Sequence, residues 1–285
     1  MRIFTNMIKL STPVDCKPLQ HRISFEDKTA LLGSCFADSM AEKMRDAGYS
    51  ILHNPFGTLY NPASILSAIL RLNSGTPFTA ADCVEMGAGS NKICSFEHHT
   101  TFARPTAEEF LANANKELEA AHKLWADCNK VIITLGTAYV WQHDGRIVSN
   151  CLKRPAGEFE HFRLEINEIR RFLGTMLKLC PDKEFIFTVS PIRHLAQGAH
   201  ENTLSKALLH VAVEEEGLEY FPAYEIMQDE LRDYRYYAED LVHPNKTAIE
   251  IIWERFSQTV LEPSEEEKRQ QNLKACKAAK HVRRT

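Results

Sequence analysis

Short apolar runs alternate along the chain with longer segments whose apolar residues recur three or four positions apart. The runs are rich in β-branched and aliphatic residues and end at turn residues, which is typical of buried strands. We expect strands at residues 28–32, 131–135, 184–189 and 218–221. The spaced apolar positions predict amphipathic helices. These are expected at residues 62–72, 106–125, 164–179, 202–216 and 244–260, the last with Pro244 as its first helical residue.

Alternating strands and helices predict an α/β protein, a three-layer α/β/α sandwich around a mostly parallel sheet. We expect one domain over residues 1–262, with a loop excursion at about 75–99 that caps the site, and a charged tail at 263–285 forming a solvated helix or a frayed end. In such sheets, sites form where the strands' carboxyl ends meet helix N-termini.

Composition narrows the class of partner. The 285 residues carry a formal net charge of −4, which gives no basic surface for nucleic acid or for an anionic membrane. The eight cysteines form no C-x-x-C pair, so we expect reduced thiols. The first twenty residues lack the apolar run of a signal segment, and no stretch reaches membrane-spanning length. A cytoplasmic protein is the expectation.

Two distant motifs carry candidate chemistry. Ser34 follows the first predicted strand in Gly33-Ser-Cys-Phe-Ala, and Asp240-Leu-Val-His243 precedes the last predicted helix. A serine nucleophile needs a base and a carboxylate that orients the base, and a D-x-x-H loop supplies both. Ser34 would lie at a helix N-terminus, whose free N–H groups suit an oxyanion. A plain helix cap is the alternative for Ser34.

Cys35 is a rival nucleophile, because a thiol in the first turn of a helix can have a lowered pKa. Its alternative is a small side chain packed beneath the strand. Adjacent residues point in different directions, so only one of the pair faces a cleft. We expect that residue to be Ser34, with Cys35 packed away from it.

The chain resembles the GSCFA-domain family, which is related to the SGNH or GDSL-type hydrolases. The name-giving motif stands letter for letter at Gly33-Ser-Cys-Phe-Ala37. Further matching blocks are Asn54-Pro-Phe-Gly57-Thr-Leu-Tyr-Asn61-Pro, Thr134-Leu-Gly-Thr-Ala138, Ser190-Pro-Ile-Arg-His194, Tyr220-Phe-Pro-Ala-Tyr-Glu225, Glu230-Leu-Arg-Asp-Tyr-Arg235 and Asp240-Leu-Val-His243-Pro. The resemblance covers roughly residues 31–255. It implies an SGNH-like fold with Ser34 as nucleophile, His243 as base and Asp240 as its orienter.

The chain departs from the wider superfamily at two blocks. The superfamily's first block has a glycine two residues before the serine, whereas Gly33 directly precedes Ser34. Its third block, G-x-N-D, supplies an oxyanion-binding asparagine, but the chain has Gly136-Thr-Ala-Tyr139. Candidates for oxyanion or substrate binding are therefore the Gly57 amide, with a turn glycine as its alternative, and the side chains of Asn54, Thr137 and Asn150.

Further candidates follow the second, third and last predicted strands. Arg193 and His194 would either bind substrate or anchor their loop. Trp141 and the tyrosines at 234, 236 and 237 would either stack on a sugar ring or pack ordinary loops. The histidines lack H-E-x-x-H or Cys-His spacing, and neither a Walker A sequence nor G-x-G-x-x-G after a strand is present. We expect no metal and no cofactor.

The resulting hypothesis is a serine esterase that cleaves O-acyl esters, for example acetyl groups, on a carbohydrate or another small hydroxylated substrate. Two alternatives stay open. The missing G-x-N-D block favours a binding or scaffolding module without turnover. An O-acyltransferase differs from a hydrolase only in how much water reaches the cleft, which no residue in the sequence decides.

Overall fold

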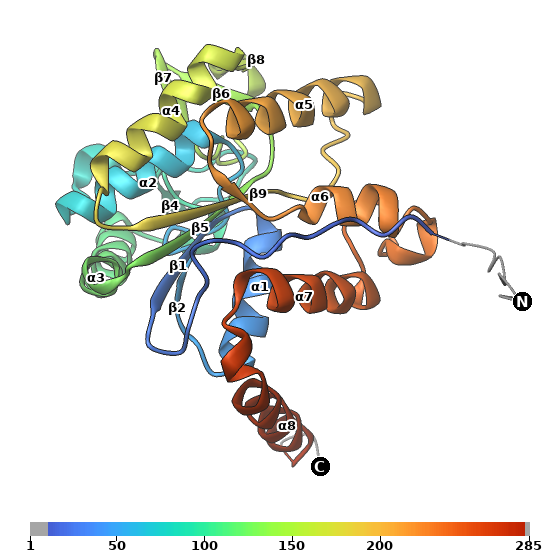
Figure 1. Cartoon of the computed structure of the whole chain (residues 1–285). Coiled ribbons are helices and arrows are strands. Elements are labelled where there is room, and N and C mark those ends of the chain that lie inside the picture. Colours follow the sequence, from blue (N-terminus) through green and yellow to red (C-terminus); the bar gives the residue numbers. More distant parts are fainter. Residues whose placement is uncertain (1–10, 283–285) are drawn as a thin grey trace, which may run out of the picture.

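A parallel five-stranded sheet forms the centre of the computed structural model, which describes residues 11–282 (Figure 1). The strand order is β10-β9-β5-β1-β2, and every neighbouring pair is parallel. The strands are β1 (Lys28–Gly33), β2 (Ser50–His53), β5 (Lys130–Leu135), β9 (Glu184–Val189) and β10 (Glu219–Tyr220). Residues 1–10 and 283–285 lie outside the described residues. The first range is half of the segment searched for a signal sequence, and the second is the end of the predicted tail.

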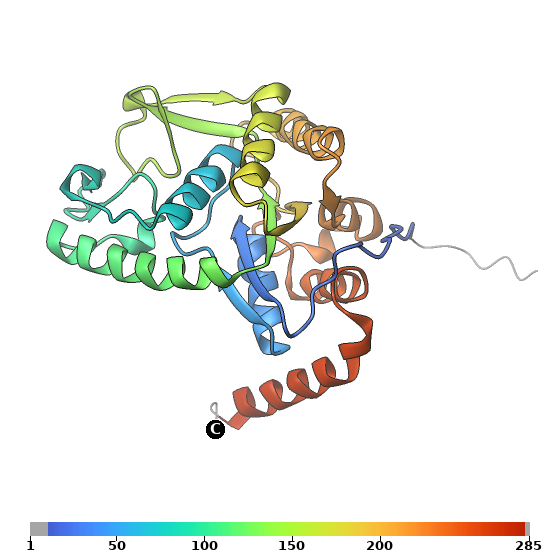
Figure 2. The same ribbon diagram turned by 60° about the vertical axis from the view of Figure 1, so that its left-hand side comes forward.

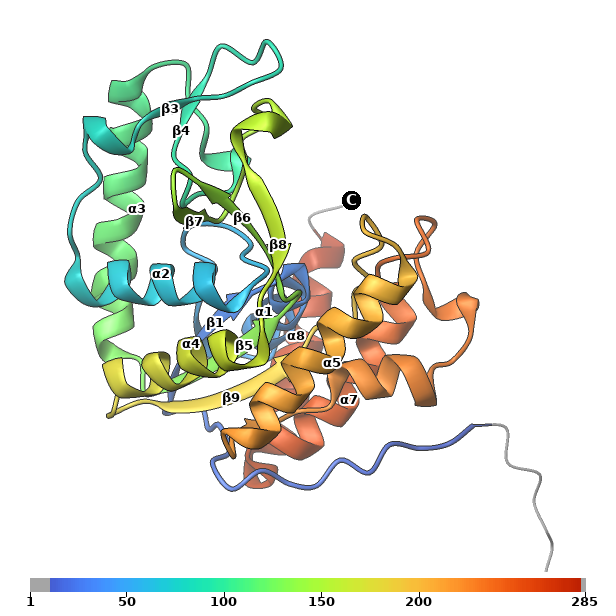
Figure 3. The ribbon, with the colours of Figure 1, turned by 90° about the horizontal axis from the view of Figure 1, so that it is seen from above.

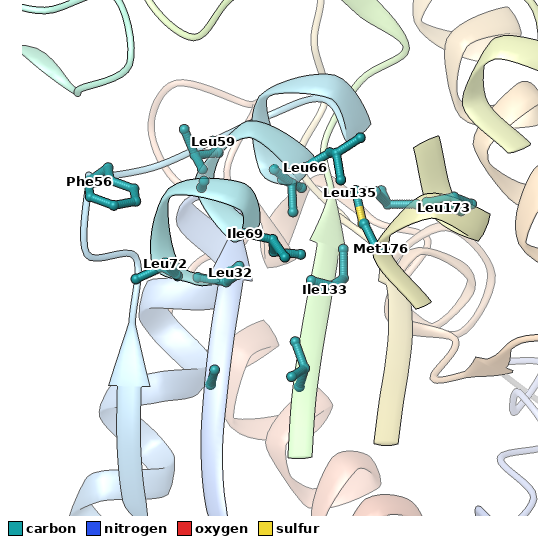
Figure 4. Packing of buried hydrophobic residues seen from close by; sticks show 14 of the residues in the cluster. Leu32, Phe56, Leu59, Leu66, Ile69, Leu72, Ile133, Leu135, Leu173 and Met176 are labelled. Atoms are coloured by element: carbon teal, nitrogen blue, oxygen red, sulfur yellow. The ribbon is translucent and has the colours of Figure 1, made fainter. Parts of the chain in front are cut away.

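Helices cover both faces of this sheet, which confirms the predicted fold class. On one face, Leu32 and Ile133 pack against α2 (Pro62–Ser74) and α4 (Ile166–Leu179), as Figure 4 shows. This layer continues into α3 (Ala107–Asp127) and α5 (Ala199–Glu215). Side chains alternate along a strand. The neighbouring Leu31 and Ile132 therefore face the opposite layer, built by α1 (Cys35–Asp46) and α7 (Lys246–Val260).

An edge strand and the start of the last helix of the sheet layers differ from the sequence prediction. The edge strand β2 was not predicted, because Ser50–His53 is short and only one of its residues is buried. Helix α7 begins at Lys246 with Asn245 as its cap, the Asn245 Oδ1 accepting the Ala248 amide at 3.1 Å. Pro244 therefore lies before the helix and is not its first residue. A side-chain cap satisfies a helix amide that has no partner within the helix.

A second, antiparallel sheet stands at the carboxyl end of the parallel one. It has the order β7-β6-β8, from β6 (Tyr139–His143), β7 (Arg146–Val148) and β8 (Glu160–Arg163). Figure 3 shows these strands between α2 and α5. The expected excursion at 75–99 holds a short 3-10 helix (Ala80–Asp82) and two short paired strands, β3 (Val84–Glu85) and β4 (Ile93–Cys94).

The C-terminal segment is a docked helix. Helix α8 (Glu266–Val282) projects below the sheet in Figure 2. Its Arg269 is 2% exposed, and Nη1 donates to the Tyr49 hydroxyl at 3.0 Å. Asn272 Nδ2 donates to the Ala47 carbonyl oxygen at 2.9 Å. The tail was predicted to be a solvated helix or a frayed end. It is a helix, and its first turns pack against the end of α1, so one side of it is not in solvent.

Two kinds of feature are absent from residues 11–282. None of the helices in this range has both the length and the apolar composition needed to cross a membrane. No three side chains of histidine, cysteine, aspartate or glutamate gather there in an arrangement that would hold a metal ion.

Candidate active site

The turn from β1 into α1 is tight and depends on glycine. Gly33 has φ = +138°, and a Cβ atom there would lie 2.2 Å from the carbonyl oxygen of Thr134 on β5. A side chain would collide with a neighbouring strand's backbone, so only glycine lets the chain turn this closely. The turn places the next two residues, Ser34 and Cys35, at the carboxyl edge of the sheet.

Ser34 caps α1 and points inward. Its hydroxyl accepts the Phe36 amide at 3.4 Å and lies 3.0 Å from the Ser190 hydroxyl, which follows β9. The residue is completely buried. The expectation that Ser34 faces the cleft while Cys35 packs beneath the strand is reversed in the structure. The physical reason is the contact with Ser190, because that hydroxyl lies in the interior after β9 and is itself completely buried.

Cys35 is the residue that faces the base. Its Sγ lies 3.5 Å from His243 Nε2, and the side chain is half-buried in the wall of a cavity. The Cys35 amide is the first of α1, so no carbonyl within the helix accepts it. The Cys35 sulfur, the His243 base and the Cys35 amide therefore lie next to one another.

Asp240 fixes the orientation of His243. Asp240 Oδ2 lies 2.6 Å from His243 Nδ1, while Oδ1 accepts the amides of Val242 and His243 at 2.9 and 3.0 Å. Leu241, between them, has φ = +56°, so the loop turns sharply. The two backbone amides, followed by the imidazole, lower the pKa of Asp240 to about 2. Asp240 is therefore an anion at neutral pH, and it holds the proton on Nδ1 so that Nε2 offers a lone pair to the thiol.

Opposing effects set the charge on the thiol. Burial, and then the Asp38 carboxylate, raise the pKa of Cys35, whereas the first amides of α1 and the Lys206 ammonium lower it. The balance lies on the raised side, so the resting nucleophile is mainly a thiol at neutral pH. It therefore needs His243 to take its proton during attack.

The cavity beside Cys35 has a volume of about 530 Å³. Thr137, Asn150, Arg193, His194 and His243 line it among the predicted site residues, but Ser34, Asn54 and Gly57 do not. No residue of the excursion at 75–99 lines it among those described, so the expected cap is elsewhere. The β6–β8 sheet and the loop before β8 supply that wall, through Tyr139, Trp141, Ser149, Asn150, Cys151 and His161.

Asn54 and Gly57 belong to the scaffold. Asn54 Oδ1 accepts the Gly33 amide at 2.9 Å, and its Nδ2 donates to Asp38 at 2.6 Å. The Gly57 amide donates to the Asn54 carbonyl oxygen at 2.8 Å, and a Cβ at Gly57 would lie 2.2 Å from that of His99. Both residues therefore hold the turn together and neither lines the cavity, so their oxyanion role stays a prediction, and the turn-glycine alternative fits the contacts of Gly57.

Polar groups of Thr137 and Arg193 already form hydrogen bonds with other parts of the protein. The Thr137 hydroxyl lies 3.0 Å from that of Ser205, and its amide donates to the Tyr60 carbonyl oxygen. Arg193 donates from Nη1 to the Leu241 carbonyl oxygen at 3.2 Å, which anchors the Asp240–His243 loop. Asn150 uses Oδ1 to accept the Leu152 amide at 2.8 Å. Arg193 therefore fits the anchoring alternative, and it also lines the cavity.

His194 is the predicted residue with an unused polar atom. Its Nε2 is buried and has no hydrogen-bond partner within the described residues. The backbone amide donates to Asn202 Oδ1 at 2.9 Å, and the ring packs edge-on against Tyr60. Nε2 would lie 3.3 Å from a Cβ at Gly136, the glycine of the altered third block. Burial, Lys206 and His243 lower the pKa of His194 to about 4, so the ring is neutral at pH 7 and has one N–H to donate.

Stacked rings form one wall of the cavity. His161 of β8 stacks on Trp141 of β6 with ring centroids 4.0 Å apart, and on Tyr139 at 5.1 Å. The register pairs Trp141 directly with His161. Of the predicted aromatic candidates, Trp141 is therefore at the cavity, whereas Tyr234 and Tyr237 line a separate depression with Arg232 and Asp233.

Lys206 was missed at the sequence level. It lies on α5 within a helical pattern that gives no hint of chemistry, and its ammonium is buried behind the cavity. The orientation of Ser34 and Cys35, by contrast, depends on the turn after β1. Gly33 stands directly before Ser34 and two residues before Cys35. The structure places Cys35 Sγ beside His243 Nε2, while the role of Ser34 as nucleophile stays a prediction.

The fold and this edge of the sheet define a parallel α/β protein with a Cys-His-Asp arrangement over a cavity. The chain belongs to the GSCFA family, whose model matches residues 28–256, and the predicted family is confirmed. Comparison with curated proteins gives no match.

Among solved structures, the chain is similar to the psychrotrophic esterase EstA from a Pseudoalteromonas species and to a GDSL-like lipase from Bacteroides thetaiotaomicron. EstA is 11% identical, with a TM-score of 0.41, over 82% of this chain and 96% of EstA. The lipase is 11% identical, with a TM-score of 0.40, over 82% of this chain and 87% of the lipase.

Proposed function

We propose that the protein is an ester hydrolase in which Cys35, and not Ser34, is the nucleophile. The observation that carries this proposal is the chain of contacts from Cys35 Sγ to His243 Nε2 and from His243 Nδ1 to Asp240 Oδ2. Nucleophile, base and orienter stand in the order that acyl transfer requires. Cys35 and His243 lie at the wall of the cavity, where a substrate would have access.

The reaction would run in two halves. His243 Nε2 takes the Cys35 proton while the sulfur attacks the acyl carbonyl carbon, and the imidazolium is stabilised by Asp240. The tetrahedral intermediate then expels the alcohol, which takes the proton from His243, and a thioester remains on Cys35. Water attacks this thioester with His243 again as base, which releases the carboxylic acid and restores the thiol.

Two donors suit the oxyanion of the intermediate. One is the Cys35 amide at the start of α1, where the helix dipole favours negative charge. The other is His194 Nε2, which is buried and unpartnered within the described residues and lies beside Gly136 of the altered third block. His194 would thereby replace the asparagine that this block lacks, with the ring in its Nε2-protonated form.

The substrate we propose is an O-acyl ester, such as an acetyl ester, on a carbohydrate or another small hydroxylated molecule. The wall of Trp141, His161 and Tyr139 supports this choice, because aromatic rings pack against the apolar faces of sugars. His243 and Asp240 have side chains 45% and 49% exposed, so water reaches the base. This access favours hydrolysis over transfer to a second alcohol.

The test is turnover of p-nitrophenyl acetate, followed by acetylated carbohydrates, by the wild type and by Cys35→Ala, His243→Ala and Ser34→Ala. We expect loss of several orders of magnitude for the first two variants. Quenched reactions of the wild type should carry one acetyl group on the peptide that contains Cys35. Ser34→Ala is the matched control, since it removes a neighbouring hydroxyl and leaves the thiol.

Three other results would contradict parts of this proposal. Activity and acylation that vanish with Ser34→Ala but persist in Cys35→Ala would return the nucleophile to Ser34. A folded wild type that neither turns over nor becomes acylated with any ester would contradict the enzyme proposal and favour a binding module. Faster acyl transfer to an added alcohol than to water would identify an acyltransferase.

A further inference from the structure

A second depression borders the candidate active site on the far side of Arg193. Arg193 lines both the cavity beside Cys35 and this depression, which has a volume of about 330 Å³. The other lining residues of the second depression all belong to residues 224–237. Because the two hollows share a lining residue, a molecule too long for the cavity can extend past Arg193 into the depression.

The depression is attached to the loop that carries the base. On one side, the Arg193 amide donates to the Val242 carbonyl oxygen at 3.3 Å. On the other side, the amide of Ala238, the residue after Tyr237, donates to the His243 carbonyl oxygen at 2.8 Å. A group bound in the depression is therefore held in a fixed position relative to the base.

Three tyrosines, Tyr224, Tyr234 and Tyr237, line the depression. Tyr237 is held in place, because Gln228 Nε2 donates to its hydroxyl at 3.1 Å and the Arg193 guanidinium lies 5.7 Å from its ring centroid. The ring centroid of Tyr234 lies 5.9 Å from that of Tyr237, and Tyr234 is 64% exposed. An exposed ring beside a fixed one offers an apolar surface on which a ligand can pack.

The polar part of the lining is balanced in charge. It consists of Arg193, Gln228, Asp229, Arg232 and Asp233. The two guanidinium groups and the two carboxylates cancel in formal charge, so the depression favours a neutral ligand over an anion or a cation. Hydroxyl groups both donate and accept hydrogen bonds, and they can therefore use each of these side chains.

A sugar ring combines an apolar face with many neutral hydroxyl groups. We propose that the second depression is a subsite for a neutral sugar unit of an oligosaccharide whose acylated unit lies in the cavity beside Cys35. Tyr234 and Tyr237 pack against the sugar, while Asp229 and Arg232 bond its hydroxyls. This inference rests on the proposed function and deepens it, because it makes the substrate an acylated oligosaccharide or polysaccharide and not a free monosaccharide.

The first experiment compares substrates of two lengths. Partially acetylated cellotetraose, xylotetraose and chitotetraose are each assayed beside the acetylated monosaccharide of the same sugar. We expect the wild type to prefer at least one tetrasaccharide by about tenfold in kcat/KM. Tyr234→Ala should remove most of this preference and leave the monosaccharide values unchanged. Leu124→Ala, at a 50% exposed position on α3 that lines neither hollow, is the control and should behave as the wild type.

The second experiment measures binding without turnover. Isothermal titration calorimetry follows the unacetylated tetrasaccharides binding to Cys35→Ala and to the double variant Cys35→Ala/Tyr234→Ala. We expect Kd to rise by about tenfold in the double variant for the tetrasaccharide that the wild type prefers. This measurement does not depend on whether the protein cleaves an ester.

The outcomes separate the subsite from the chemistry. Ester turnover with no preference for any tetrasaccharide, or with a preference that persists in Tyr234→Ala, would overturn the subsite and leave the proposed hydrolase intact. Tetrasaccharide binding that depends on Tyr234, in a wild type that cleaves no ester, would contradict the proposed function while the sugar site stands. Binding that is equal in the two calorimetry variants would place the sugar elsewhere and overturn the inference.

Discussion

At the scale of single residues, the site depends on which of two neighbours turns outward. Ser34 and Cys35 are adjacent, and both stand at the start of α1. Ser34 bonds the Phe36 amide and the Ser190 hydroxyl, while Cys35 takes the outward position toward His243. The motif alone does not show which of the two neighbours turns outward, because this depends on contacts with Ser190 and His243, which are distant in the sequence. Asp240 and His243 could be identified from their spacing, because their contact lies within one local turn.

His194 gives the first prediction at this scale. His194→Ala should lower kcat about 100-fold with little change in KM, because an oxyanion donor acts in the transition state. His194→Gln should recover part of the loss, since its amide also donates. The pKa of about 4, which burial causes, leaves the ring neutral above pH 6, so the ratio of wild-type to variant kcat should be constant from pH 6 to 9.

Steady-state kinetics over this pH range check the prediction. A merely structural role would show as reduced stability with no recovery in His194→Gln. Loss confined to KM would instead mean that His194 binds the ground state, and it would remove the residue from the proposed oxyanion site.

At the scale of elements, a strand can be predicted from the sequence when both of its faces are buried. The strands β1, β5 and β9 are central, so their residues form continuous apolar runs that are easily recognised. The edge strand β2 and the β6–β8 sheet mix aromatic, polar and charged residues, and their pairing is set by distant contacts. The cavity wall was therefore predicted in the wrong segment, at 75–99, although Trp141 itself was a candidate.

The β6 strand offers a matched test of this wall. Alternation on the strand places Trp141 on the cavity side and Gln142 on the other. Trp141→Ala should raise KM for an acetylated carbohydrate by up to about tenfold with kcat nearly unchanged. Gln142→Ala should leave both constants unaltered. Equal effects in the two variants, or a loss in kcat alone, would show that Trp141 does not bind the substrate.

At the scale of the whole molecule, two apolar layers hold the two halves of the site together. Cys35 begins α1 in one layer, whereas Lys206 and the cavity wall belong to the other. The parallel sheet lies between these layers, and its carboxyl edge brings Cys35, His243 and Lys206 to one end of the molecule. Alternating strands and helices allowed this three-layer arrangement to be predicted. The α8 contact through buried Arg269 could not be, because a charged segment normally stays in solvent.

Stability of the whole molecule should fall in weak acid because of buried histidines. His98 is fully buried among Phe56, Phe78, Phe102 and Phe110, and its Nδ1 bonds the Ser95 hydroxyl at 2.6 Å. Burial, and then Arg71, lower the pKa of His98 to about 3. An unfolded histidine has a pKa of about 6.5, so between these values the unfolded state binds the extra proton. Stability therefore decreases as pH falls through this window.

For His98 alone, the decrease from pH 7 to pH 5 amounts to about 2 kcal/mol in the free energy of unfolding. His98→Leu removes the titrating group, so its unfolding free energy should fall by about 2 kcal/mol less than that of the wild type over the same interval. Urea unfolding at both pH values measures the two differences, and the lost Ser95 bond cancels within each protein. His200→Leu, at an exposed position, is the control and should behave as the wild type. A His98→Leu variant that loses as much stability in acid as the wild type would mean that His98 is already protonated in the folded protein, and that the aromatic cluster around it accommodates an imidazolium.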